Sequence, residues 1–383
     1  MINILNGVRV LDLSRYISGP FCARMLADMG AEVIKVEKAG HGDEGRFCGP
    51  MCNGESLYFS AFNRNKKSIT IDFRSEKGQS VLRKLIEKSD IIVENFKAGT
   101  MAAMGLGYEE IKKINPRAVL VSITGFGQTG PDSKRPAYDP IISCRAHLFA
   151  QIGEGEFCAG PDLMSDTVAG IHGALAAMLA LYDREKTGEG QWVDTCMLTS
   201  SLATQAIALS NYAMNDGQDN YTIDAPNGIY KTKDGYFNIT SGPQPMFTRL
   251  RQLIDDPVIR DEKYLDVKKR IQDEELLKQH ITKWTEVRTN EEIDQILGEN
   301  MITCGRVSTW GDLLKDRQLE HRDDLVYLPV KNCGKVPYPR FPAKFSAHPE
   351  REDKPAPDLG EDNCNVLASL LGMSPEEVEE FTK

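Results

Sequence analysis

The sequence predicts an α/β fold in which a parallel sheet carries helices and a smaller, mostly helical domain interrupts it. Three observations lead to this prediction. From residue 8 to residue 123, short apolar runs alternate with amphipathic runs, which is the pattern of strands joined by helices. Residues 246–310 lose this alternation and read mostly as charged amphipathic helix, with apolar residues at helical spacing. Short apolar runs resume at residues 325–330, after that stretch.

Five apolar runs predict the strands of the sheet. They lie at residues 8–13, 32–37, 68–73, 90–94 and 118–123. The helices between them are predicted where apolar residues recur at helical spacing. These helices lie at residues 20–30, 75–88 and 108–114. Strands that alternate with helices in this way indicate a parallel, Rossmann-like sheet.

Residues 168–181 predict a long helix, because they contain no Pro and are rich in Ala and Leu. Apolar residues fill most of its circumference, so we expect it to be buried. Ser165 or Asp166 is predicted as its N-cap, and Lys186 with Gly188 marks its end. Free N–H groups and the helix dipole would favour the ionised form of Asp166 there. Taken alone, this stretch predicts a capping aspartate and not a reactive group.

The second half of the chain predicts a different organisation. Residues 200–214 form a second helical run, and residues 233–236 form a tight hairpin turn between short strands. Helices are predicted at residues 274–284 and 290–297. Residues 374–377, which read Ser-Pro-Glu-Glu, form a capping box before a last helix. The middle of the chain therefore reads as a small separate domain.

The composition is that of an ordinary globular protein. Of the 383 residues, 41% are hydrophobic and 27% are charged. The sequence has no run of about 18 apolar residues, so we expect no membrane span. Residues 1–7 lack the basic and apolar regions of a signal peptide, so we predict a cytoplasmic protein.

Cysteine usage and charge exclude further classes. The nine cysteines are scattered, and only Cys48 and Cys52 lie close together, with His41 as the one nearby His. A metal site is therefore not expected. The net charge of −10 argues against non-specific nucleic-acid binding. Residues 1–100 nevertheless hold 15 Lys and Arg against 12 Asp and Glu, which suits a polyanionic small ligand.

Two Gly-x-Gly-x-x-Gly strings occur, at residues 40–45 and 125–130. Each follows a predicted strand, which is half of the dinucleotide-binding fingerprint. Neither string opens a predicted helix, which a bound pyrophosphate requires. We therefore reject a nicotinamide or flavin site.

Short segments spread over nearly the whole chain resemble the motifs of one protein family. They occur in the same order as in that family. They are residues 7–12, Gly19-Pro20, residues 32–37, Gly42-Asp43 with Arg46, residues 63–68, residues 94–97 with Gly99, residues 115–117, residues 125–131, Tyr138-Asp139, residues 166–170 and residues 187–191. Together they resemble the class III CoA-transferases, which include formyl-CoA, carnitine and bile-acid CoA-transferases. No single string is decisive, but the ordered set is highly specific.

The resemblance implies roles for individual residues. Asp166 matches the nucleophile of the family. Asn95, Phe96 and Lys97 match a loop that contacts coenzyme A, and Tyr138 and Met197 match wall residues near the thioester. Further positions that line the nucleotide part are Arg15, Tyr16, Ile17, Ser18, Lys38, Ile71 and Arg74. The implied co-substrates are coenzyme A and acyl-CoA, with no permanently bound cofactor and no metal.

The resemblance also implies an architecture. A large Rossmann-like, CoA-binding domain is expected from residues 1–224 and 321–383, and a small α+β domain from residues 225–320. The expected partner is a second copy of the chain, in a homodimer whose subunits interlock. The expected ligands are an acyl-CoA donor and a carboxylic acid acceptor, with no nucleic acid and no membrane.

The implied chemistry needs neither ATP nor a metal. Asp166 would attack the acyl carbon of a thioester, giving a mixed anhydride and then an aspartyl-CoA thioester, from which an acceptor acid takes coenzyme A. Oxyanion donors are expected among backbone N–H groups at the helix start or around Gly242.

Two departures and two alternatives stand beside this interpretation. Where formyl-CoA transferase has a glycine-rich loop, residues 241–245 contain a single Gly, so oxalate is not the expected acceptor. A family Arg is replaced near Ala102-Ala103-Met104. The first alternative is a 2-methylacyl-CoA racemase, whose catalytic His is replaced here by Tyr138. The second is a non-catalytic CoA-binding protein, against which the retained Asp166 argues.

Some of these residues also have plainer interpretations. Without the resemblance, Lys97 reads as a solvated surface lysine and Tyr138 as a core residue. His172 lies within the apolar helix and reads as a core residue and not as a base.

Overall fold

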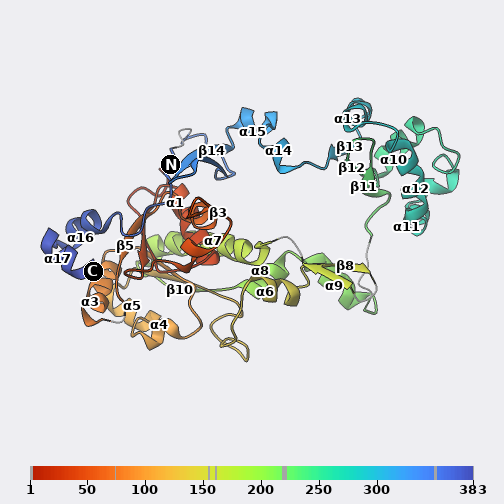
Figure 1. The fold of residues 1–383 in the computed structure, drawn as a ribbon. Coiled ribbons are helices and arrows are strands. Elements are labelled where there is room, and N and C mark those ends of the chain that lie inside the picture. Colours follow the sequence, from red (N-terminus) through yellow and green to blue (C-terminus); the bar gives the residue numbers. More distant parts are fainter. Residues whose placement is uncertain are drawn as a thin grey trace. The chain divides into compact units, whose positions relative to one another are not determined.

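The structure is a computed structural model that describes residues 3–73, 75–153, 156–159, 162–217, 222–348 and 352–382. The chain forms two compact units, shown in Figure 1. The first comprises Met1–Ala206 and Asp323–Lys383, and the second comprises Ile207–Arg322. The first unit thus joins segments that lie on both sides of the second along the chain. The domain boundaries at residues 224 and 320 stay a prediction.

The first unit contains a sheet of six parallel strands in the order β10-β7-β6-β1-β2-β5. Their bounds are β1 (Arg9–Asp12), β2 (Glu32–Glu37), β5 (Lys67–Thr70), β6 (Ile91–Glu94), β7 (Val119–Thr124) and β10 (Trp192–Cys196). Counted along the chain, this is the doubly wound order 3-2-1-4-5-6. The predicted parallel sheet is confirmed, and β10 is a strand that the periodicity did not indicate.

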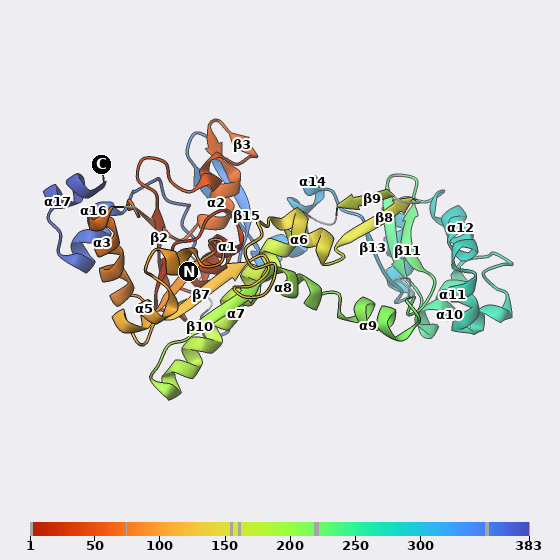
Figure 2. The same cartoon turned by 90° about the horizontal axis from the view of Figure 1, so that it is seen from below.

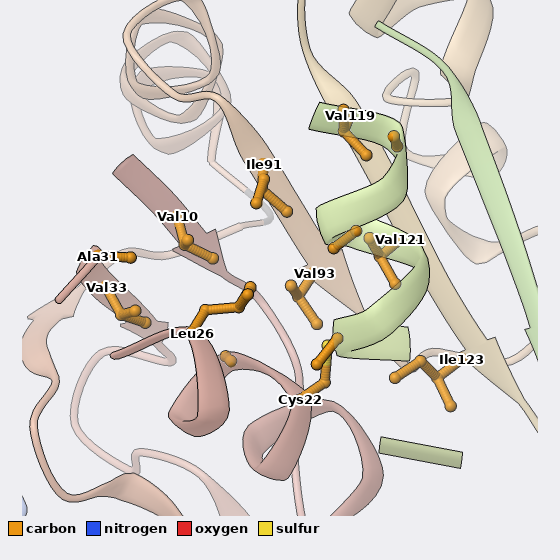
Figure 3. Close-up of a cluster of buried hydrophobic side chains, with 14 of the residues drawn as sticks. Val10, Cys22, Leu26, Ala31, Val33, Ile91, Val93, Val119, Val121 and Ile123 are labelled. Carbon is orange, nitrogen blue, oxygen red and sulfur yellow. The ribbon is translucent and has the colours of Figure 1, made fainter. Parts of the chain in front are cut away.

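Helices cover both faces of the sheet. Neighbouring residues of each strand point to opposite faces, so each strand contributes apolar side chains to two separate cores. Val10, Ile91 and Val119 pack with α1 (Ser18–Asp28) and α7 (Met164–Thr187) in the core cluster of Figure 3. The next residue of each strand faces the other core, against four further helices. These helices are α3 (Glu76–Glu87), α5 (Tyr108–Ile114), α16 (Asn363–Leu371) and α17 (Pro375–Thr382).

Helix α7 begins differently from the prediction. It starts at Met164, and its N-cap is Leu163, which has a left-handed backbone (φ 62°) and makes no side-chain cap. The predicted capping role of Ser165 or Asp166 is therefore wrong, because both lie within the first turn. At the other end, Gly188 adopts the left-handed conformation of a C-cap, as predicted.

The expectation that α7 is buried all round is also wrong for the single chain. Small residues bring one side of α7 against α1, and a Cβ on Gly170 would lie 2.8 Å from the carbonyl oxygen of Ser18. The other side carries an apolar stripe that is exposed. Its members are Ile171, Leu175, Leu179 and Tyr182, between 43% and 65% exposed.

By length and composition alone, α7 is apolar enough to cross a membrane, and it is the one helix of the described residues that meets this test. Core helices of globular proteins meet it too. Figure 2 shows α7 running beside β7 and β10 of the sheet, where its buried side packs.

Shorter elements complete the first unit. They are η1 (Glu44–Phe47), β3 (Met51–Cys52), β4 (Glu55–Ser56), α2 (Leu57–Asn63), α4 (Thr100–Ala103), α6 (Asp139–Arg145), β8 (Phe149–Gly153), β9 (Glu156–Ala159), α8 (Met197–Ala203), β14 (Leu325–Val330) and β15 (Gly334–Pro339). The predicted capping box is confirmed, because Ser374 and Glu377 exchange hydrogen bonds at 2.7 and 3.3 Å. Neither Gly-x-Gly-x-x-Gly string opens an α-helix.

The second unit begins at Ile207, the second residue of α9 (Ala206–Met214), and a break before α9 divides the predicted helical run 200–214. Strands β11 (Asn227–Lys231), β12 (Tyr236–Thr240) and β13 (Thr303–Arg306) form an antiparallel sheet, and the predicted turn joins the first two. The helices are α10 (Gln244–Leu253), η2 (Glu262–Leu265), α11 (Val267–Gln272), α12 (Glu274–Thr285), α13 (Asn290–Glu299), α14 (Trp310–Leu313) and α15 (Arg317–Arg322). This unit has its own apolar core, which includes Tyr230, Phe237 and Ile281.

Candidate active site

A cavity of about 410 Å³ opens where the strand order of the sheet reverses. Strands β1 and β6 are neighbours, and the chain leaves them toward opposite sides of the sheet. In doubly wound sheets the loops at such a point separate and leave a crevice beyond the carboxyl ends of the strands. Residues 15–18 after β1 and residues 95–98 after β6 both line this cavity.

Asn95 holds these two loops together. Its side-chain oxygen accepts the backbone N–H of Arg15 at 2.8 Å, and its side-chain nitrogen donates to the Arg15 carbonyl at 2.7 Å. The same nitrogen lies 3.3 Å from the hydroxyl of Ser18. The Asn95 amide is therefore already used to clamp the loop that follows β1.

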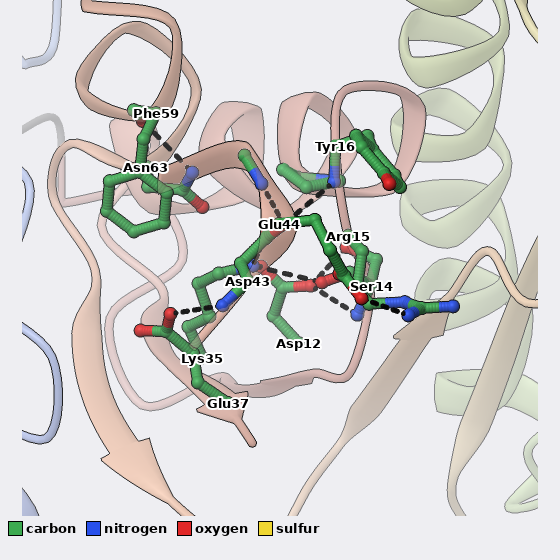
Figure 4. Close-up of polar contacts among 12 residues, drawn as sticks. Asp12, Ser14, Arg15, Tyr16, Lys35, Glu37, Asp43, Glu44, Phe59 and Asn63 are labelled. Carbon is green, nitrogen blue, oxygen red and sulfur yellow. Dashed lines mark hydrogen bonds and ion pairs between the residues drawn. The ribbon is translucent and has the colours of Figure 1, made fainter. Parts of the chain in front are cut away.

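A cluster of buried charges lies beneath the loop after β1, as Figure 4 shows. Lys35 on β2 is completely buried, contacts Asp43 at 2.8 Å and donates to the carbonyl of Ser14 at 2.9 Å. Asp12 at the end of β1 is also completely buried, and it binds Lys66 at 2.7 Å. Burial alone would raise the pKa of Asp12, but the charges of Lys66 and Lys35 outweigh it and lower that pKa.

The same cluster fixes the backbone of Tyr16. Asp43 accepts the N–H of Tyr16 at 3.2 Å, while Tyr16 adopts a left-handed conformation with φ 63°. Such a conformation is costly for a residue with a bulky side chain and persists only where the surroundings impose it. The Tyr16 ring meets the Tyr138 ring edge-on, with centroids 5.9 Å apart. Tyr138 itself is 62% exposed, so its interpretation as a core residue is wrong.

Asp166 faces the cavity from the first turn of α7. Burial raises the pKa of its carboxyl to about 6, and the negative charge of Asp139 adds to this. Hydrogen bonds from the hydroxyl and backbone N–H of Ser18 act in the opposite direction. The expectation that the pKa of Asp166 would favour ionisation is therefore wrong in direction, because burial and the Asp139 carboxylate raise this pKa.

The structure brings most of the predicted site residues together. Those that line the 410 Å³ cavity are Asp166, Arg15, Tyr16, Ile17, Ser18, Asn95, Phe96, Lys97, Tyr138 and Met197. Lys97 is exposed. This agrees with its interpretation as a surface lysine as well as with a role in contacting coenzyme A. The roles of these residues stay predictions.

A second cavity of about 340 Å³ adjoins the first and is lined by Lys38, with Arg15 and Phe96 shared between the two. Arg15 pairs with Glu44 at 2.8 Å, and its guanidinium lies over the Phe96 ring. Ile71 is completely buried in the core and lines neither cavity. Arg74 lies outside the described residues.

Three titratable residues that line the cavity were not predicted. Tyr58 reaches the cavity from α2, and burial, followed by the charge of Asp166, raises the pKa of its hydroxyl. Asp139, at the start of α6, accepts the backbone N–H of Asp166 at 3.0 Å. Arg135 lines the cavity and pairs with Asp132 at 3.3 Å. The sequence offered one signal for these residues: Asp139 directly follows Tyr138 in a segment that resembles the family.

The single glycine of residues 241–245 is held within the second unit. Gly242 donates its N–H to Asn227 at 2.9 Å, and Arg270 donates to its carbonyl at 2.8 Å. A Cβ on Gly242 would lie 2.2 Å from Asp224. The N–H of Gly242 is thus occupied, and so is that of Asp166, which removes both from the expected oxyanion donors.

No group of three or more metal-ligating side chains occurs in the part of the chain that the structure describes. Within the same residues, no histidine lines the cavity that contains Asp166. All nine cysteines are free thiols.

Comparisons with known proteins agree in one result. A family model for CoA-transferase family III matches residues 5–363. The succinyl-CoA:glutarate CoA-transferase of Mus musculus is 35% identical over 96% of this chain and 86% of its own length. The succinyl-CoA–D-citramalate CoA-transferase of Chloroflexus aurantiacus is 32% identical over 98% of this chain and 96% of its own. The crystal structure of a CAIB/BAIF family protein from Brucella suis is 30% identical and has a TM-score of 0.84, covering 97% of this chain and 100% of that one.

Proposed function

The chain belongs to CoA-transferase family III and is a CoA-transferase, and from this premise we propose that Asp166 carries coenzyme A covalently between an acyl-CoA donor and a carboxylic acid. One observation carries the proposal. Asp166 is the carboxylate that the first turn of α7 presents to a cavity at the switch point of the sheet.

The position of the two cavities supports the binding of an acyl-CoA across them. The 340 Å³ cavity carries Lys38 and shares Arg15 with the first, so it offers cations to the phosphates of coenzyme A. The 410 Å³ cavity leads from Lys97 to Asp166 and suits the thioester end. The apolar Phe96 and Met197 line the same path.

The first half of the reaction transfers the acyl group and then coenzyme A to the enzyme. The ionised carboxylate of Asp166 attacks the acyl carbon, the carbon–sulfur bond breaks, and coenzyme A leaves as the thiolate. The mixed anhydride that remains is attacked by this thiolate at the Asp166 carbonyl. An aspartyl-CoA thioester forms and the donor acid is released as its carboxylate.

The second half repeats these steps with the acceptor. Its carboxylate attacks the aspartyl thioester, giving a new mixed anhydride and free CoA thiolate. The thiolate then attacks the acceptor acyl carbon, which forms the new acyl-CoA and regenerates Asp166. One thioester replaces another, so the exchange needs no ATP and no redox cofactor.

A dicarboxylic acid is the proposed substrate class. The names of the two relatives share succinyl-CoA, with glutarate and D-citramalate as the second acid. Arg15, Lys97 and Arg135 line the same cavity as Asp166, so it holds cations for a second carboxylate. No histidine among the described residues lines this cavity, which supports transfer over the racemase alternative.

The function is tested by trapping the intermediate. Wild-type protein given succinyl-CoA is expected to carry a succinyl or CoA adduct on the peptide that contains Asp166. Hydroxylamine or borohydride captures it and peptide mass spectrometry locates it. Adding glutarate should then yield glutaryl-CoA and free succinate, with oxalate as the comparison acid. An adduct on another residue, or turnover without any adduct, contradicts the mechanism.

An interlocked homodimer in the cytoplasm is also part of the proposal. The exposed stripe of α7 supports it, because Ile171, Leu175, Leu179 and Tyr182 are spaced along one helix face and a lone chain leaves them in water. A second copy of the chain would cover them. The free state of all nine cysteines suits a reducing compartment.

Analytical ultracentrifugation tests the dimer. At low micromolar concentration the wild type should sediment as a dimer that dilution does not dissociate. Leu175→Glu with Leu179→Glu should shift it to monomer or aggregate, because charges then replace the apolar contact. Val287→Glu, at an exposed valine of the second unit, is the control. A stable folded wild-type monomer would overturn this part of the proposal.

A further inference from the structure

A chain of three buried serine hydroxyls lies directly behind Asp166. Ser143 belongs to α6, Ser165 to α7 and Ser201 to α8. The hydroxyl oxygens of Ser143 and Ser165 lie 2.9 Å apart, and Ser201 donates to Ser165 at 2.9 Å. Ser165 and Ser201 are completely buried and Ser143 is nearly so. None of the three lines the cavity, so none is a substrate contact in this structure.

The chain of hydroxyls ends on Asp139. Ser143 donates to Asp139 Oδ1 at 3.1 Å, and Asp139 Oδ2 accepts the backbone N–H of Asp166 at 3.0 Å. Each hydroxyl has one proton to donate. Because Ser143 gives its proton to Asp139, Ser165 must donate to Ser143, and Ser201 to Ser165. All three protons therefore point toward the Asp139 carboxylate.

This arrangement ties three helices to one carboxylate. Buried hydroxyls cost free energy unless each is bonded, and alanine would fill nearly the same space without that requirement. We propose that Ser143, Ser165 and Ser201 are positioning residues of the transfer reaction, which hold the Asp139 carboxylate against the backbone N–H of Asp166. The inference rests on the proposed role of Asp166 as the nucleophile.

Holding Asp139 in this place has an electrostatic consequence. Burial raises the pKa of Asp166 to about 6, and the charge of Asp139 contributes in the same direction. Charged and titratable side chains that face Asp166 or line its cavity are Asp139, Tyr58, Tyr16, Tyr138, Arg15, Lys97 and Arg135. If the serines no longer hold Asp139, its charge moves away and Asp166 ionises at a lower pH.

The test is the pH profile of transfer in Ser143→Ala and Ser165→Ala. In the wild type, kcat/KM should fall below about pH 6, because Asp166 attacks only when ionised. In both variants we expect this fall in kcat/KM, the acid limb of the profile, to occur at lower pH. We also expect kcat to be lower by about tenfold, equal to about 1.4 kcal/mol, while KM for acyl-CoA stays unchanged. Asp139→Asn removes the charge itself and should move the limb furthest.

Two controls separate positioning from folding. Ser200→Ala removes a buried hydroxyl beside Ser201 on α8 that is outside the chain of three, and it should leave the limb in place. Ser143→Thr keeps the hydroxyl and should restore both the limb and the rate. Thermal unfolding of each variant identifies any variant that does not fold. If a serine variant does not fold, the pH profile of Asp139→Asn tests the positioning role in its place.

The outcomes are distinct. If the two alanine variants fold and keep the wild-type limb and kcat, or if Asp139→Asn leaves the limb unchanged, the positioning role is overturned while the transferase function stands. If Ser200→Ala moves the limb as far as Ser165→Ala does, the role is overturned as well. If the wild type shows neither transfer nor an adduct at Asp166, the inference falls together with the proposed function.

Discussion

Asp166→Asn is expected to abolish CoA transfer and to make the protein more stable. The amide cannot form an anhydride, so transfer should fall by roughly a thousandfold or more, as when a covalent nucleophile is removed from other enzymes. The shape of the side chain is kept, so CoA binding, measured by calorimetry, should persist. The variant should carry no adduct after exposure to succinyl-CoA.

The gain in stability follows from the raised pKa of Asp166. The folded pKa of about 6 lies about 2 pKa units above the ordinary aspartate value of 3.8. At about 1.4 kcal/mol per unit, the ionised carboxylate costs the folded state about 3 kcal/mol, to order of magnitude. This cost is fully present above pH 6, shrinks as the pH falls, and disappears below about pH 4, where both states become protonated. Asn never bears it.

Thermal unfolding at fixed protein concentration measures this effect. Asp166→Asn should unfold at a higher temperature than the wild type at pH 7.5, and the difference should vanish below about pH 4. Asp183→Asn, at an exposed position of the same helix, is the matched control and should show no gain. A variant that is less stable at pH 7.5, or that keeps near-normal turnover, would make Asp166 a structural residue.

Lys66→Met is expected to cause the largest loss of stability. Lys66 is nearly inaccessible and donates three hydrogen bonds, to Asp12, to the carbonyl of Pro20 and to Asn63, at 2.7, 2.9 and 2.8 Å. Burial lowers its pKa to about 8 against the opposing charge of Asp12, so it is mostly protonated at pH 7. Removing it leaves a buried carboxylate without its main partner, which costs about 3–5 kcal/mol.

The adjacent residue supplies the control. Lys67 pairs with Glu32 at 2.7 Å, but both side chains are partly in water, with 45% and 33% exposed. Lys67→Met should therefore cost at most about 1 kcal/mol. The urea midpoint should fall clearly in Lys66→Met and little in Lys67→Met. Equal shifts in the two variants would show that the buried pair of Asp12 and Lys66 contributes no more to stability than the partly exposed pair of Lys67 and Glu32.

The sheet was predictable because its signals are local. The strand at residues 32–37 and the helix at residues 108–114 have the predicted bounds, since apolar periodicity and turn residues define them within a few positions. Lys35 shows the limit of such signals. A lysine in the middle of a strand does not reveal that it is buried, because Asp43 and Ser14, which satisfy it, come from other loops.

The candidate site was predictable in part, but for a different reason. The residues after β1 and β6 were expected from the resemblance to the CoA-transferases and not from the strand pattern, whereas Tyr58 and Asp139 meet Asp166 only through the packing of α2 and α6. The error at the start of α7 has another cause. Ser165 and Asp166 are good capping residues, but the chain turns at Leu163, and a leucine in a left-handed conformation has no sequence signal.

Strand β5 forms an edge of the six-stranded sheet, and the C-terminal segment covers it. Asp362 accepts the N–H of Ser68 at 2.9 Å, and Asn363 accepts that of Thr70 at 2.8 Å. A separation of 294 residues lies between Ser68 and Asp362. A ribosome therefore makes this strand long before the side chains that cover it, and the whole second unit emerges in between. During that interval the nascent sheet has an open border, where a chaperone or a neighbouring nascent chain can pair.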